Sequence, residues 1–155
     1  MITKNKEGPR NTVWATRKIK IGSSNKYPCI HEWIFDKIKI QNGILGIYFA
    51  DGDLPQKGDG HFCAYRYWIN MRKLFKPWKR SEWRSQTHFS MGSEEPNKIS
   101  MKVDEKKMEM YIGIDKWPMQ MAHEIKKEGN YLMAVSFYSN KDTMSLKEYR
   151  VSRST

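Results

Sequence analysis

The chain has 155 residues and a formal net charge of +11 at pH 7, and 39% of its residues are hydrophobic. This length and apolar content favour one folded domain over a disordered basic tail. No apolar run approaches the about 20 residues that cross a bilayer, and the first residues contain no hydrophobic segment, so we expect neither a membrane partner nor secretion. Two cysteines do not make a disulfide framework, which favours a cytoplasmic location.

Residues 1–11 are polar and charged and are expected to form a flexible basic arm, followed by a single β-rich domain over residues 12–155. The segment Thr12–Ile21 ends in alternating apolar and cationic residues, which indicates a strand. Residues 32–50 are predicted to form a hairpin around Asn42-Gly43, because both residues of this pair tolerate positive φ.

After a loop over Asp51–Gly60, the segment His61–Met71 fits a strand better than a helix, because its period of two is maintained for longer. The expected inward residues are Cys63, Tyr65, Tyr67, Ile69 and Met71, and the expected opposite face carries Arg66, Trp68, Asn70 and Arg72. The alternative is a helix that would align Ala64, Trp68, Met71 and Phe75. Since Pro77 interrupts regular structure, Lys76–Ser85 is predicted to be an extended loop.

In the second half, residues 99–103 and 108–114 flank a polar tetrapeptide and are predicted to form a second hairpin. Residues 118–128 are predicted to form a short α-helix that ends at a glycine cap, Gly129. Residues 131–138 and 144–151 are predicted to form a third hairpin. The fold class that follows is mainly β, an antiparallel barrel or sandwich of about eight strands with one short α-helix over 118–128.

The stretch Tyr65–Arg84 concentrates charge and aromatic rings, with seven cations and one anion, Glu82. Cations neutralise phosphates and aromatic rings stack on bases of any sequence, so the stretch predicts a nucleic-acid-binding protein of low sequence specificity, with DNA favoured over RNA. The predicted contact residues are Arg66, Trp68, Arg72, Lys73, Lys76, Trp78, Lys79, Arg80, Trp83 and Arg84. A second basic group, Arg10, Arg17, Lys18 and Lys20, extends this surface if the first strand lies beside it.

Two other functions stay open. The first is a protein-binding inhibitor or adaptor whose basic face docks an acidic partner protein. The second is a small metal-independent nuclease, for which His61, His88, His123 and Glu82 offer acid and base groups. Because no catalytic motif is present, a binding protein is favoured over an enzyme, and no catalytic residue is assigned. A compact chain rich in lysine and methionine suggests a phage or other mobile element as its origin.

Two mirrored tripeptides, Cys29-Ile-His31 and His61-Phe-Cys63, contain residue types that bind zinc. Residues two apart on a strand point the same way, so the two pairs are able to form a four-ligand site. The usual spacing between zinc-binding cysteines is absent, and Cys63 falls on the predicted core face. The sequence therefore predicts no metal and no other cofactor.

Overall fold

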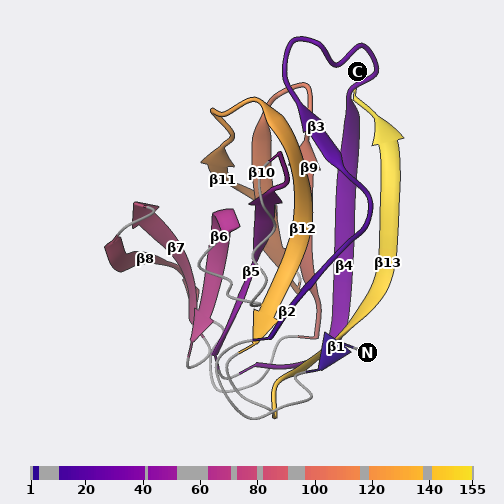
Figure 1. Cartoon of the computed structure of the whole chain (residues 1–155). Coiled ribbons are helices and arrows are strands. Elements are labelled where there is room, and N and C mark those ends of the chain that lie inside the picture. Colours follow the sequence, from indigo (N-terminus) through magenta and orange to yellow (C-terminus); the bar gives the residue numbers. More distant parts are fainter. Residues whose placement is uncertain are drawn as a thin grey trace.

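The computed structural model describes the backbone of residues 2–3, 11–40, 42–51, 63–70, 73–79, 82–90, 97–115, 119–137 and 141–154. These residues form thirteen strands in two antiparallel sheets that pack face to face, as Figure 1 shows. The part of the chain described contains no helix. It therefore also contains no helical segment suited to crossing a bilayer. The prediction of a mainly β, antiparallel sandwich is confirmed.

The first sheet follows the order β1 (Ile2–Thr3), β13 (Thr143–Arg153), β4 (Cys29–Lys39), β9 (Ile99–Asp104), β10 (Glu109–Ile114) and β11 (Gln120–Glu124). The second follows the order β2 (Asn11–Trp14), β12 (Gly129–Phe137), β5 (Asn42–Phe49), β6 (Cys63–Asn70), β7 (Lys73–Lys79) and β8 (Glu82–Ser90). Strand β3 (Ile19–Ile21) also pairs with β12. Within the segment expected to be a flexible arm, Ile2 and Thr3 pair with β13.

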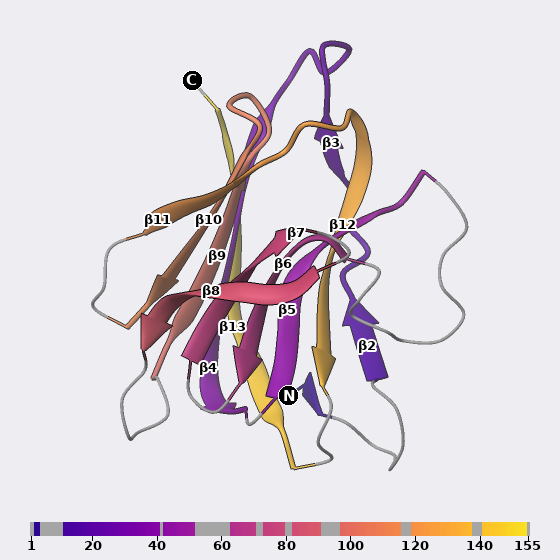
Figure 2. The ribbon, with the colours of Figure 1, turned by 90° about the vertical axis from the view of Figure 1, so that its left-hand side faces the viewer.

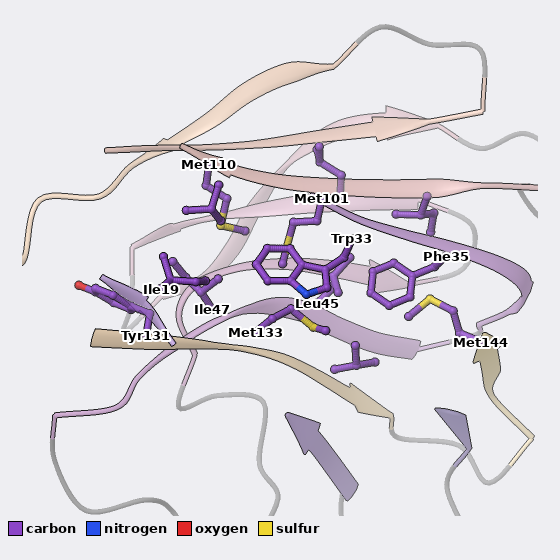
Figure 3. Packing of buried hydrophobic residues seen from close by; sticks show 14 of the residues in the cluster. Ile19, Trp33, Phe35, Leu45, Ile47, Met101, Met110, Tyr131, Met133 and Met144 are labelled. Carbon is purple, nitrogen blue, oxygen red and sulfur yellow. The ribbon is translucent and has the colours of Figure 1, made fainter. Parts of the chain in front are cut away.

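The core lies between the sheets and is built from alternate residues of the long strands, as expected when one face of each sheet is buried. Trp33, Phe35 and Met101 from the first sheet pack toward Leu45 and Met133 from the second (Figure 3). Each of these five side chains is at most 4% exposed. This apolar layer holds the two sheets together.

The hairpin predicted over residues 32–50 is wrong, because β4 and β5 belong to different sheets. The chain crosses from one sheet to the other after Ile40, whose side chain is 2% exposed. Gly43 lies inside β5, where an added Cβ would come within 3.1 Å of Ile40 and 3.2 Å of the Ser136 carbonyl. The glycine thus permits close packing at the crossing, and Asn42-Gly43 does not form a tight turn.

The third predicted hairpin is wrong for the same reason. Strand β12 pairs with β2, β3 and β5, whereas β13 pairs with β1 and β4 in the other sheet. Strand β12 is buried along its length between neighbours of its own sheet, whereas β13 is mostly exposed and lies beside β4, so the two strands do not pair with each other. The hairpin predicted over residues 99–114 is confirmed, since β9 and β10 pair along their whole length.

The helix predicted over residues 118–128 is also wrong. Residues 120–124 form strand β11, whose backbone bonds are satisfied by pairing with β10. Gly129 has a φ of +143°, which differs from the about +57° of a glycine helix cap. Pairing of residues 120–124 with β10 at the edge of the sheet is therefore favoured over the helix that the local sequence pattern predicts.

The basic stretch is a strand meander that includes β6, β7 and β8. The strand predicted over His61–Met71 is confirmed by β6, and the helical alternative fails. The loop predicted over Lys76–Ser85 is wrong, because Lys76, Pro77 and Lys79 of β7 pair with residues of β8. Pro77 is tolerated within β7 because it lies two residues beyond Phe75, the last position paired with β6. The strand predicted over Thr12–Ile21 is divided into β2 and β3.

Candidate functional site

The residues predicted to contact nucleic acid are spread over three adjacent strands. Arg66 and Trp68 lie on β6, Lys73, Lys76, Trp78 and Lys79 on β7, and Trp83 and Arg84 on β8. Arg72 and Arg80 lie outside the described residues, as do the side chains of the other eight. The register pairs Trp68 with Ile44 of β5.

The second basic group does not extend that surface. Arg17, Lys18 and Lys20 are exposed beside or within β3, which pairs with β12. Strands β7 and β8 lie at the other end of the strand order in the same sheet. The expectation of one continuous basic face from these two groups is therefore wrong, and Arg10 lies outside the described residues.

A different basic surface gathers at one end of the sandwich, where several connections meet (Figure 2). We call it the loop-end surface: residues 22–28 between β3 and β4, residues 105–108 between β9 and β10, residues 125–128 before β12, and Arg153–Ser154 at the end of β13. The N–H of Ser23 donates to the Glu128 carboxylate at 3.3 Å, and the N–H of Ser154 donates to the Pro28 carbonyl at 3.0 Å. Connections far apart in sequence are thereby fixed to one another.

Glu105 lies at the centre of this surface and is 7% exposed. One carboxylate oxygen accepts from the N–H of Cys29 at 2.7 Å and from the amide of Asn25 at 3.2 Å. The other accepts from the N–H of Lys20 at 2.7 Å and from His31 Nε2 at 3.1 Å. A buried carboxylate with four donors is well satisfied, so Glu105 fixes β3, the 22–28 loop and β4 to the turn after β9.

His31 continues the network into the core. Because an ionised carboxylate only accepts, the ring donates from Nε2 to Glu105, while Nδ1 lies 2.7 Å from the Tyr149 hydroxyl. The rings of His31, Trp33 and Tyr149 are stacked, with Trp33 and Tyr149 centroids 5.3 Å apart. Both nitrogens of His31 are thus hydrogen bonded within the protein, which leaves neither for a zinc ion. Cys63 lies on the opposite sheet, and His61 lies outside the described residues.

The row of carboxylate, imidazole and phenol ends at the Tyr149 hydroxyl, which is hydrogen bonded to His31 Nδ1. Burial raises the pKa of Tyr149, nearby Arg17 lowers it, and the charges of Glu105 and Cys29 raise it further, which leaves the pKa above its ordinary value. The phenol is therefore a poorer acid than a free tyrosine. Among the other histidines considered for catalysis, His123 packs edge-on against Tyr65, and only the backbone of His88 is described.

Tyr27 is the most exposed large apolar residue of the described chain, with 70% of its surface accessible. The Arg153 guanidinium lies 5.5 Å from the centre of its ring, a cation–π arrangement. The loop-end surface and its border carry seven lysines and arginines, all exposed: Lys20, Lys26, Lys106, Lys107, Lys126, Lys127 and Arg153. The loop-end surface thus combines one exposed ring with a strongly positive field.

The Glu105 network predicts how stability depends on pH. Burial raises the pKa of Glu105, but hydrogen bonds from His31, Lys20 and Cys29 outweigh this effect and leave the pKa below its ordinary value. The ionised Glu105 carboxylate therefore stabilises the fold fully above about pH 4.3, its pKa in the unfolded chain. This stabilisation is lost as the pH falls through the lower pKa of the folded protein. Urea unfolding between about pH 5 and pH 3 should show a steeper loss for the parent than for Glu105→Gln. Parallel curves would contradict the assignment.

No family model matches the sequence, and no curated protein matches it. Solved structures do match the fold. The SPRY domain of human HERC1 aligns with a TM-score of 0.59 and 13% identity, covering 98% of this chain and 91% of that one. The TRIM65 PSpry domain aligns with a TM-score of 0.61 and 15% identity, covering 88% of this chain and 70% of that one. Lectin I-B4 from Griffonia simplicifolia aligns with a TM-score of 0.53 and 8% identity, covering 94% and 81%.

The fold is a SPRY- and lectin-like β-sandwich. The solved structures that this chain matches are SPRY and lectin domains, which bind proteins or carbohydrates rather than nucleic acid, and the prediction of a nucleic-acid-binding protein is therefore wrong. The comparisons give no support to a phage origin either. Sequence reasoning gave weight to charge density in one stretch, whereas this sandwich brings together cations from four separate connections.

The residues at the centre of the loop-end surface were missed in the sequence. Tyr27 stands in a short polar loop before Pro28, and Glu105 stands in a charged turn. Neither position has a local pattern that separates it from ordinary surface residues. Their roles arise from contacts over long sequence separations, such as the 85 residues between Lys20 and Glu105.

Proposed function

We propose that this SPRY- and lectin-like sandwich is a protein-binding domain, acting as an inhibitor or adaptor, and that its loop-end surface docks an acidic partner protein. The observation that carries the proposal is Tyr27, 70% exposed on a loop tied to the rest of the fold through Glu105. Exposed tyrosines on well-held loops are typical energetic centres of interfaces, because they bury a large area at a small entropic cost.

The charge of the loop-end surface supports an acidic partner. Seven exposed cations lie on the loop-end surface or at its border, and one of them, Arg153, contacts the Tyr27 ring, whereas Glu105 is buried and bonded and Glu128 accepts from Ser23. Complementary charge accelerates association and excludes partners of like charge. A cytoplasmic setting is part of the proposal, since the thiol of Cys29 is free beside this surface.

Selection of phage-displayed random peptides on the immobilised protein tests the proposal. We expect enrichment of acidic peptides, and binding of the synthesised best peptide should fall at least about tenfold in Tyr27→Ala and in the double variant Lys26→Glu/Lys106→Glu. Binding is measured by isothermal titration calorimetry, and thermal unfolding should stay close to that of the parent, because all three residues are exposed.

The matched control is Lys39→Glu/Lys98→Glu, which makes the same change in net charge with two exposed lysines at the opposite end of the sandwich. This variant should keep most of the affinity. An equal loss of affinity in both double variants would mean that binding depends only on net charge. Selected peptides whose affinity is unchanged in Tyr27→Ala and in the Lys26→Glu/Lys106→Glu variant would reject the docking surface.

A further inference from the structure

Strand β13 presents a long open edge. It pairs with β4 on one side from Thr143 to Arg153, but on the other side β1 covers only Thr143 and Met144. Beyond Met144, no strand among the described residues lies on that side. Figure 1 shows β13 at the border of its sheet, with β4 inward of it. A row of backbone groups is therefore available for a further strand.

The direction of these backbone groups follows from one hydrogen bond. The N–H of Ser154 donates to the Pro28 carbonyl at 3.0 Å, on the β4 side. Backbone groups of successive residues alternate across a strand, so those of Ser152 and Arg150 also point toward β4. The N–H and C=O groups of Tyr149, Val151 and Arg153 then point to the open edge. The pairing with β4 is regular over this stretch, because the register shifts lie before Glu148.

The side chains along the edge are partly apolar and mostly cationic. Val151 is 38% exposed and, beyond the register shift, Leu146 is 44% exposed. Lys147, Arg150 and Arg153 are exposed on the same strand. Arg17, from the segment between β2 and β3, is close enough to lower the pKa of Tyr149. Glu148 is the one carboxylate of the strand's regular part, and Arg150 already binds it at 2.6 Å and 2.9 Å.

This pattern selects between two possible occupants. A second copy would bring the same cations of two edges together, and each chain has a net charge of +11, so electrostatic repulsion disfavours it. An extended acidic segment of a partner protein places carboxylates beside the cations of β13. If its residues alternate between acidic and apolar, it also places an apolar side chain beside the exposed Val151. Strand β1 already shows that an antiparallel segment adds to this side of β13.

We propose that the edge of β13 from Glu148 to Arg153 binds an extended acidic segment of the partner protein as an added antiparallel strand. The proposal rests on the acidic partner of the proposed function and adds a second contact to it, since Arg153 joins the edge to Tyr27. Main-chain hydrogen bonds provide the affinity in this mode, and alternate side chains provide the selectivity.

The first test uses a synthetic peptide that alternates valine with glutamate and is slightly longer than Glu148–Arg153, added to the intact protein. Amide exchange measured by NMR should slow at least about tenfold at Tyr149, Val151 and Arg153, because these amides gain partners. It should change little at Arg150 and Ser152, whose amides point toward β4. A matched peptide that alternates valine with lysine should give no protection. If the valine–glutamate peptide slowed exchange equally at all amides of β13, or at none of them, the proposal would be overturned.

The second test removes one edge donor. Val151→Pro lacks the N–H that points outward, and proline is tolerated on an open edge, so the variant should fold and bind the valine–glutamate peptide at least about tenfold more weakly. Val151→Thr retains the donor and should bind nearly as the parent does. Retained affinity in a folded Val151→Pro would overturn strand addition, and the exchange pattern of the parent decides the matter if this variant does not fold.

The two proposals fail in different ways when the peptide selected by phage display is measured on both sets of variants. If affinity for the peptide falls only in Tyr27→Ala, the proposal for the loop-end surface is supported and the β13 edge is rejected as part of the interface. If affinity falls only in Val151→Pro, the proposal for the β13 edge is supported and the loop-end surface is rejected. A loss of affinity in both sets of variants supports both proposals. Unchanged affinity in both sets rejects both proposals.

Discussion

Replacing Glu105 with alanine should lower the free energy of unfolding by about 3–5 kcal/mol, the range for removing one member of a buried charged network. The carboxylate accepts four hydrogen bonds while only 7% exposed. Without it, the N–H groups of Lys20 and Cys29 are left buried without an acceptor, and His31 loses its carboxylate. Urea unfolding at neutral pH measures the loss.

The matched control for this prediction is Glu128→Ala. Glu128 is an exposed carboxylate at the same end of the sandwich, and its one backbone contact is to Ser23 at 3.3 Å. Its replacement should cost less than about 1 kcal/mol. If the two variants were equally stable, Glu105 would be an ordinary surface residue and the loop-end surface would lack the rigid support we assign to it.

Replacing Gly129 with alanine should lower the free energy of unfolding by about 2–4 kcal/mol, because backbone strain and overpacking act together. The φ of Gly129 is +143°, and an added Cβ would lie 2.5 Å from the Phe49 ring and 2.7 Å from the Asp51 carboxylate. Neither neighbour moves freely. Phe49 packs edge-on against Tyr131, and Asp51 accepts from the N–H of Asn130 at 2.7 Å. Thermal or urea unfolding measures the effect.

Gly113→Ala provides the comparison. The φ of Gly113 is not positive, and the nearest atom to an added Cβ is the sulfur of Met119 at 3.0 Å. A methionine side chain adapts readily, so the expected loss is about 1 kcal/mol or less. A Gly129→Ala protein as stable as Gly113→Ala would show that the start of β12 relaxes without strain.

The sequence was a good guide to local extended structure. The alternation after His61 predicted β6, and the apolar segments on either side of residues 104–107 predicted the β9–β10 hairpin, which forms as expected. In these segments each strand pairs with a near neighbour in sequence, so local patterning and final pairing agree.

Prediction failed where the partner of a strand is distant. Asn42-Gly43 has a strong turn signal, but burial of Ile40 and Leu45 between the sheets is worth more than a tight turn, and the chain crosses the sandwich instead. Met119, Ala122 and Ile125 have a helical spacing, but β10 offers backbone hydrogen bonds to residues 120–124 and a strand forms.

The candidate site shows the same division. Composition determined that the protein is basic and folded, the alternating patterns determined that it is β-rich, and the alternative of an acidic protein partner was already open on charge alone. The place where that charge gathers was decided by tertiary structure, which brings Lys26, Lys106 and Arg153 to one end of the sandwich. The physical reason is that Glu105, His31 and Tyr149 satisfy one another only across sequence separations of 74 and 118 residues, which no local pattern encodes.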